Sequence, residues 1–258
     1  FTDTARVSKI NLRLCYPNYS EKEIELLARE SLISLGKLYA EMGMSFMWSV
    51  DKVQDLIVKI EGLEHLEKAM EEENGIIFNV PHLGNWEVMT IFFRRYFNMT
   101  AMYKPAKIPA LDDFIYKTRV RVGIDLVPAD SGGVKSLFRV LKNKGIIGVL
   151  PDQEPGLKGG VFAPLFGQTA LTGKLVCKMA SKSSAAILFA YAKRLDNGRF
   201  CVVLKPGNEQ IRNTDEVAAA TALNASIEEC VNDCPEQYQW NYKRFRRQPE
   251  GRSNFYKK

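Results

Sequence analysis

Short apolar runs separated by longer polar stretches organise most of this chain. Four runs have the length and composition of buried strands, and they span 76–80, 145–150, 185–192 and 200–204. Strands that alternate with helical stretches are typical of α/β domains with a parallel or mixed sheet. We therefore predict a single α/β domain over 1–258, with a mixed or mostly parallel central sheet flanked by helices.

The N-terminal part, 1–60, is predicted to be mainly helical, with one long helix over 23–59. The middle of this helix carries an apolar cluster made of Met42, Met44, Phe46, Met47 and Trp48. Two interpretations stay open, because the cluster could pack in the core or could lie on lipid beside an acyl groove. The solvent exposure of Trp48 distinguishes them.

One of the two histidines, His82, follows the first predicted strand and precedes a helical stretch over 86–97. Gly84 permits a close backbone approach, and Asn85 has the side chain of an N-cap, so the helix start would favour an anionic ligand. Glu87, in the first helical turn, could fold back to orient His82 and stabilise its imidazolium. The pair predicts a general base that activates a hydroxyl, although such a histidine is often only a satisfied polar group.

A second candidate pair, Asp152 and Gln153, follows the run 145–150, at a strand end where α/β enzymes commonly place functional groups. The pair could bind sugar hydroxyls or hold the glycine-rich loop, or Asp152 could simply cap backbone amides. Gly160 and Phe162 lie just beyond. Phe162 could line an acyl groove, but aromatic residues in such places are more often ordinary core.

Charge adds a hypothesis about partners. The net charge is +6, and cations gather in two zones, 94–121 and 243–258. These zones predict anionic partners, such as phosphorylated lipid, an anionic membrane surface or an acidic carrier protein, although a solvated basic face is the default. No helix-turn-helix, zinc-finger or RNA-binding signature accompanies them, so nucleic acid is not expected.

Composition excludes several classes of protein. A chain of 258 residues with 46% apolar and 26% charged residues can bury a full core. Five scattered cysteines predict free thiols rather than a disulfide framework, and no metal site is expected from them. No apolar run approaches the roughly 20 residues that a membrane-spanning helix needs.

Four blocks of sequence, taken together, resemble the lipid A biosynthesis lauroyl/myristoyl acyltransferases of Gram-negative bacteria, a family of the lysophospholipid acyltransferase superfamily. PHLGNWE at 81–87 resembles the HX4(D/E) motif of that superfamily, here with Glu rather than the commoner Asp. The other blocks are Tyr103-Lys104-Pro105 with Leu111-Asp112 and Arg119, the stretch 150–172, and the stretch 235–251. The resemblance runs from about 74 to 251, which we expect to be the catalytic core of a glycerolipid-acyltransferase-like fold.

The resemblance implies transfer of a fatty acyl chain from acyl carrier protein to a hydroxyl of a phosphorylated lipid A precursor, as a late secondary acylation. It implies no covalent enzyme intermediate, metal or cofactor. His82 would be the base, Glu87 its orienting partner, and Arg119 the cation that stabilises the oxyanion or binds phosphate, with Lys104 in support. The residues expected to bind substrate are Asn85, Lys104, Asp152, Gln153, Gly160 and Phe162.

The family also implies a location and leaves rival functions. Its members work on the cytoplasmic face of the inner membrane, so a membrane helix is expected upstream of Phe1. A glycerophospholipid acyltransferase of the same superfamily is one rival, but the blocks at 150–172 and 235–251 favour lipid A. A thioesterase or hydrolase could use the same histidine and glutamate to activate water, and a silent lipid-binding protein is a further alternative.

Overall fold

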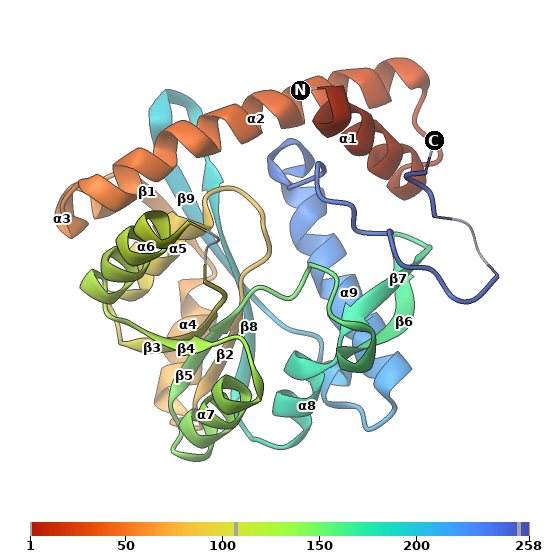
Figure 1. Ribbon diagram of the computed structural model, residues 1–258. Helices are drawn as coiled ribbons and strands as arrows, with labels where there is room; N and C mark the ends of the chain where they lie inside the picture. Colours follow the sequence, from red (N-terminus) through yellow and green to blue (C-terminus); the bar gives the residue numbers. More distant parts are fainter. Residues whose placement is uncertain (1, 106–107, 252–253, 258) are drawn as a thin grey trace.

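The central sheet of the computed structural model is mixed and mostly parallel, as predicted (Figure 1). The structure describes residues 2–105, 108–251 and 254–257, so the basic residues Lys107, Arg252 and Lys258 lie outside it. Within these residues, seven strands lie in the order β1-β9-β8-β2-β5-β3-β4, and only β8 and β9 are antiparallel neighbours. The strands are β1 (Ile57–Glu61), β2 (Ile76–Asn79), β3 (Met99–Tyr103), β4 (Ile124–Pro128), β5 (Ile146–Val149), β8 (Ala186–Arg194) and β9 (Phe200–Pro206).

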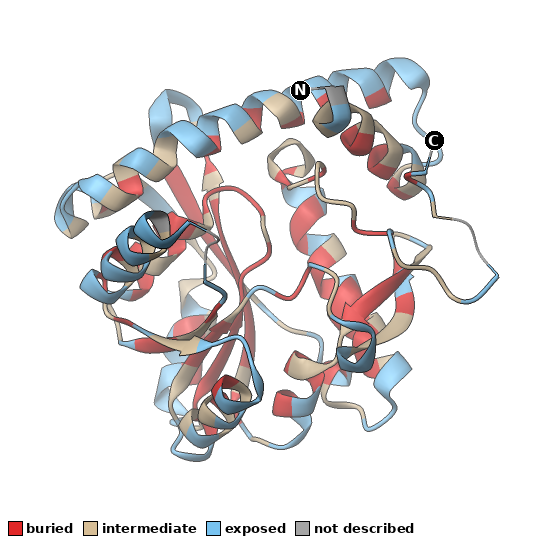
Figure 2. Cartoon of the chain, viewed as in Figure 1, coloured by how far each residue is buried: buried red, intermediate tan, exposed pale blue. Residues whose placement is uncertain are grey.

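Helices cover both faces of the sheet, and this explains why its central strands are continuous apolar runs. Along β2, Ile76 and Phe78 pack in one hydrophobic cluster, whereas Ile77 between them packs in the other. The first cluster is covered by α4 (Leu63–Glu71) and α5 (Trp86–Phe93). The second is covered by α7 (Ser131–Lys142), α8 (Leu175–Ser181) and α9 (Glu216–Asp233). Figure 2 shows the buried sheet between these layers.

The N-terminal segment is less uniform than predicted. Helices α1 (Thr2–Cys15) and α2 (Glu21–Met47) pack together, and α2 lies along the top of the molecule in Figure 1. The prediction of one helix over 23–59 is wrong at its C-terminal end, because α2 ends at Met47. Ser49 caps a separate short helix, α3 (Val50–Gln54), and the chain then enters β1, which pairs with β9.

The helix expected over 86–97 ends early, at Phe93, and 94–96 form a turn instead. A further helix, α6 (Pro109–Arg121), follows β3, and an antiparallel hairpin of β6 (Gly160–Leu165) and β7 (Gln168–Gly173) stands apart from the main sheet. Short 3-10 helices span Leu157–Gly159, Asp196–Gly198, Glu209–Arg212 and Pro235–Gln237.

The apolar cluster at the end of α2 does not pack wholly in the core. Met44 contacts a core cluster, but Met47 is 67% exposed and Trp48 is 38% exposed. All five cysteines are buried and free, which confirms the prediction of free thiols. None of the helices in the described part of the chain combines the length and hydropathy that a bilayer crossing requires.

Candidate active site

The carboxyl ends of three neighbouring parallel strands carry four of the predicted site residues. His82 follows β2, Asp152 and Gln153 follow β5, and Lys104 follows β3. In the sheet register, Asn79 of β2 lies beside Val149 of β5. His82 and Asp152 are each three residues beyond that paired position, so the sheet itself brings them together.

Asp152 orients His82. Its carboxylate accepts the His82 main-chain N–H at 2.9 Å and contacts Nδ1 of the imidazole at 2.8 Å. The structure gives Asp152 the place that the sequence predicted for Glu87. The carboxyl group of Asp152 is buried, which alone would raise its pKa, but the charge of His82 and the hydrogen bonds from His82 outweigh burial, and its pKa lies below the ordinary value.

The opposite ring nitrogen of His82 is left with a lone pair. With Nδ1–H donated to Asp152, Nε2 can only accept, and the Gln153 amide lies 3.2 Å from it. The same amide donates to Oε1 of Gln239 at 3.1 Å. The Trp86 ring meets the imidazole edge to face, with centroids 5.0 Å apart. This is the tautomer that a general base requires, because Nε2 is ready to take a proton.

Glu87 has a different partner from the one expected. Its carboxylate accepts from Nη2 of Arg119 at 2.6 Å and from Nε at 3.4 Å. The side chain of Glu87 is 3% exposed and that of Arg119 is 25% exposed. Glu87 lies on the first turn of α5 and pairs with α6, which carries Arg119, instead of folding back to His82. The glutamate of the HX4E motif therefore holds a guanidinium rather than the imidazole.

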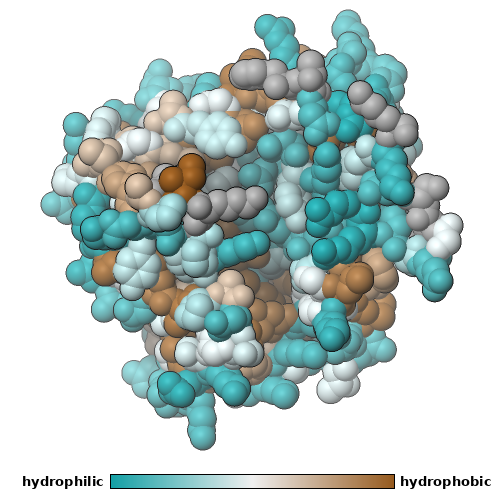
Figure 3. Space-filling view, in the orientation of Figure 1, coloured by the Kyte–Doolittle hydropathy of each residue, from teal (hydrophilic) through white to brown (hydrophobic). Residues whose placement is uncertain are grey.

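A cavity of about 470 Å³ opens beside both pairs. Its walls are mainly apolar, and residues from α5 and the strands β3, β4 and β5 supply many of them. In Figure 3 the surface is hollowed near the middle of this face, with hydrophobic side chains at the bottom. The polar residues predicted from the sequence that line it are His82, Glu87, Lys104, Arg119 and Gln153. An apolar cavity with a few convergent polar groups suits a ligand with a long hydrocarbon chain.

Lys104 is exposed at this cavity and makes no hydrogen bond or ion pair with another described residue. It therefore remains available for an anion. Among the residues that the structure describes, no group of three or more His, Cys, Asp or Glu side chains is placed to hold a metal ion.

Three of the residues predicted to bind substrate do not line the cavity. Asn85 is fully buried and caps α5 by accepting the N–H groups of Glu87 and Val88, which confirms the predicted N-cap but removes it from the substrate surface. Gly160 and Phe162 lie on the hairpin and are not among the described residues that line the cavity. At Gly160 a Cβ atom would lie 2.6 Å from Cγ of Pro155, so tight packing explains this glycine.

Sequence reasoning missed the contribution of the segment 237–239. The main-chain N–H of Gln239 donates to the carbonyl of His82 at 3.1 Å. Tyr238 is buried, and burial, the charge of Asp152 and a hydrogen bond to Asp152 raise the pKa of its hydroxyl. The block at 235–251 was visible as a family signature, but nothing local indicated that it would support His82 from about 155 residues away.

Several cations of the two basic zones already have partners within the protein. Arg244 is buried and donates to the carbonyl of Leu171 and the hydroxyl of Thr172. Lys243 pairs with Asp3, and Lys117 pairs with Asp113. The two basic zones are thus weaker evidence for anionic partners than the sequence indicated.

Residues 2–247 match the family model described as bacterial lipid A biosynthesis acyltransferase. The chain belongs to this family. The lipid A biosynthesis palmitoleoyltransferase of Escherichia coli (strain K12) is 28% identical over 252 residues, which are 97% of this chain and 81% of that protein. The lauroyltransferase of the same organism is 26% identical over 249 residues, which are 96% of this chain and 80% of the relative.

A third relative, the lipid A biosynthesis myristoyltransferase of Escherichia coli (strain K12), is 26% identical over 260 residues, covering 98% of this chain and 78% of that protein. The resemblance inferred from the four sequence blocks is therefore confirmed. The acyltransferase is of the lipid A family, which disfavours the glycerophospholipid alternative.

Proposed function

We propose that this protein transfers a fatty acyl chain, of the lauroyl/myristoyl class, from the thioester of acyl carrier protein to a hydroxyl of a phosphorylated lipid A precursor. The reaction would be a late, secondary acylation. The observation that carries the proposal is His82, whose Nδ1 is held by buried Asp152 while its ring lines a mainly apolar cavity. Membership in the lipid A acyltransferase family supports the same reaction.

The chemistry needs one base. The acceptor hydroxyl gives its proton to Nε2 of His82 as its oxygen attacks the thioester carbonyl carbon, and Asp152 stabilises the imidazolium that forms. The tetrahedral intermediate then collapses, the carbon–sulfur bond breaks, and the imidazolium returns the proton to the departing thiolate. The products are an ester and a free thiol, and no bond to the protein forms at any step.

Arg119 and Lys104 supply positive charge. Arg119 lines the cavity and is fixed by Glu87, so its guanidinium is preorganised to stabilise the developing oxyanion. Lys104, which is exposed at the same cavity, would bind a phosphate of the acceptor as a point charge. Gln153, whose amide reaches Nε2 of His82, lies where the attacking hydroxyl must bind and would release that contact to it.

The site would work at the cytoplasmic face of the inner membrane. Large apolar side chains are exposed at the end of α2 and on α6, including Met47, Trp48, Phe114 and Tyr116. The two helices are neighbours, because Arg121 donates to the carbonyl of Trp48. These side chains together with Arg121 and Lys117 suit an anionic lipid surface. A membrane helix upstream remains an expectation from the family.

Mass spectrometry tests the reaction. Tetra-acylated and penta-acylated lipid A precursors are incubated with the protein and with acyl carrier proteins that bear a series of chain lengths, and His82→Ala serves as the matched control. We expect a mass gain of one acyl chain with the wild-type protein only, and the favoured donor identifies the chain length. Free fatty acid without an acylated product would instead identify the thioesterase alternative, since the same base would then activate water.

A further inference from the structure

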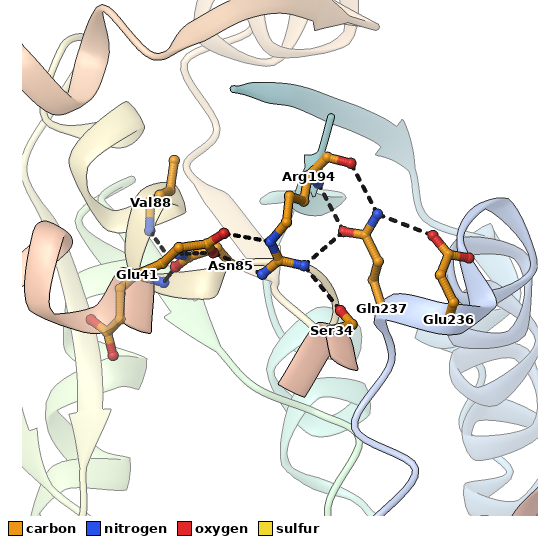
Figure 4. Close-up of polar contacts among 8 residues, drawn as sticks. Ser34, Glu41, Asn85, Val88, Arg194, Glu236 and Gln237 are labelled. Atoms are coloured by element: carbon orange, nitrogen blue, oxygen red, sulfur yellow. Dashed lines mark hydrogen bonds and ion pairs between the residues drawn. The ribbon is translucent and has the colours of Figure 1, made fainter. Parts of the chain in front are cut away.

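A polar cluster joins α2, the end of β8, the start of α5 and Gln237 (Figure 4). Its two central residues, Glu41 and Arg194, are not among the described residues that line the cavity. At its centre, Arg194 at the end of β8 forms a two-pronged ion pair with Glu41 of α2. Nε lies 2.5 Å from one carboxylate oxygen, and Nη2 lies 2.8 Å from the other. The side chains are only 6% and 16% exposed, respectively. Nη1 of Arg194 also donates to Ser34 on the same helix, at 3.0 Å.

Glu41 determines the orientation of the Asn85 side chain. The Asn85 amide nitrogen donates to Oε2 of Glu41 at 3.0 Å, and a carboxylate can only accept. The amide oxygen must therefore face the start of α5, where it accepts the N–H groups of Glu87 at 3.1 Å and Val88 at 3.2 Å. Glu87 in turn holds Arg119. A chain of hydrogen bonds therefore runs from Glu41 through the Asn85 cap and Glu87 to the guanidinium of Arg119 at the cavity.

Arg194 also holds the other side of the turn. Both main-chain polar groups of Arg194 bond to the side-chain amide of Gln237, at 2.8 Å and 3.0 Å. The carbonyl of Gln237 then accepts the N–H of Gly84 at 3.1 Å. Gly84 has a φ of +60°, and a Cβ there would lie 2.0 Å from the carbonyl oxygen of Ala192, so the turn lies directly against β8.

We infer that Glu41 and Arg194 are positioning residues for the reaction. They touch neither the cavity nor His82 among the described contacts, but they fix the first turn of α5 and so place the Glu87–Arg119 pair. The N-terminal helix α2 thereby belongs to the catalytic apparatus, although the family motifs begin only near residue 74. The inference deepens the proposed function, on which its kinetic consequences rest.

A purely structural ion pair would behave differently. Replacing one partner of a buried pair commonly destabilises the fold because the other charge is left uncompensated. Such a role predicts a lower melting temperature with an unchanged kcat for each folded molecule. A positioning role predicts a lower kcat in protein that remains folded, because a small displacement of a catalytic group slows the chemical step steeply.

Glu41→Gln tests this, because the side chain keeps its shape and loses its charge. We expect kcat to fall about tenfold or more, with the KM for the acyl donor unchanged within about twofold. Glu41→Asp keeps the charge but places the carboxylate one methylene group farther from Asn85 and Arg194. It is the test variant if Glu41→Gln does not fold, and the same fall in kcat is expected. Glu25→Gln on the same helix is the matched control, since Glu25 is exposed and its ion pair among the described residues is with Lys9, and it should leave kcat unchanged.

A second readout does not depend on acyl transfer. The amide resonances of Glu87 and Val88, which donate to Asn85, should shift in the Glu41 variants and stay in place in Glu25→Gln. A folded Glu41 variant with wild-type kcat would overturn the inference. If the wild-type protein transfers no acyl chain, the proposed function fails by itself, and unshifted amides would then overturn the positioning role separately.

Discussion

Two buried carboxylates each hold a basic side chain that lines the same cavity, yet the two pairs are suited to different chemistry. In the first pair, Asp152 holds His82, whose charge changes when it takes a proton. In the second, Glu87 holds Arg119, whose charge is permanent. The first pair can therefore move a proton, whereas the second can only present hydrogen bonds and charge. The motif spacing joins His82 to Glu87 in sequence, but the fold assigns them to separate pairs.

The largest effect should come from breaking the first pair. His82→Ala and Asp152→Asn should each lower kcat by about 1,000-fold or more, because the base is removed or its tautomer is no longer enforced. Product formation at saturating substrate, with circular dichroism to verify folding, measures this. His65→Ala removes the other histidine and should have no effect. An Asp152→Asn variant with near-normal kcat would show that Asp152 does not orient the base.

Breaking the second pair should cost less. Arg119→Ala and Glu87→Ala should each lower kcat by about 100-fold, the usual loss of one preorganised oxyanion donor. If Glu87 acts only through Arg119, the double variant should be no slower than Arg119→Ala, because the two side chains form one unit. Effects that multiply in the double variant would mean that Glu87 has a role apart from Arg119.

The first pair should also make the stability of the protein depend on pH. The pKa of Asp152 lies below its ordinary value of 3.8, so its ionised form stabilises the fold above that pH, and this contribution is lost as pH falls through the folded-state pKa. Asp152→Asn should be less stable than the wild type by about 1–3 kcal/mol near neutral pH. The difference should narrow below pH 3.8. Urea unfolding over a pH series measures it, and a constant difference would contradict the assignment.

The smallest effect is expected at Lys104, which belongs to neither pair. Lys104→Ala should raise the KM for the phosphorylated acceptor about fivefold, because one exposed charge contributes about 1 kcal/mol, and should leave kcat almost unchanged. The wild-type KM should rise with salt while the variant responds less. Equal salt dependence in both proteins would remove Lys104 from the phosphate site. Lys59→Ala is the control, because the Lys59 ammonium pairs with Glu61 on β1, away from the cavity.

The four strands predicted from the sequence correspond to β2, β5, β8 and β9, which are neighbours in the sheet, whereas β3 and the two edge strands β1 and β4 were not predicted. Central strands such as β2 are buried on both faces and appear as continuous apolar runs. β1 lies at an edge, its residues are partly exposed, and it follows a helical stretch, so the prediction extended the helix through it. Local periodicity cannot reveal that Ile60 lies beside Val202, because that pairing is made by distant parts of the chain.

The candidate site also has parts that the sequence predicted and parts that it did not. The position of His82 on a strand-to-helix turn could be predicted, because the strand, the turn and the helix are each indicated by residues close together in the sequence. The role of Asp152 depends on the register of β2 against β5, and no local pattern encodes that register. Glu87 was assigned to His82 because it is near in sequence. Its place on the first turn of α5 instead directs its carboxylate to Arg119.

The contacts of residues 237–239 with the His82 turn also bear on biosynthesis. The ribosome synthesises the chain from the N-terminus to the C-terminus. His82, Asp152 and Arg119 are therefore all made well before residues 237–239, which hold the turn. A nascent chain or a prematurely terminated one that ends before Gln237 carries every reacting group without the support that aligns them. We therefore expect activity to arise only after residues 237–239 have been made and have folded against the turn, so shorter chains should be inactive.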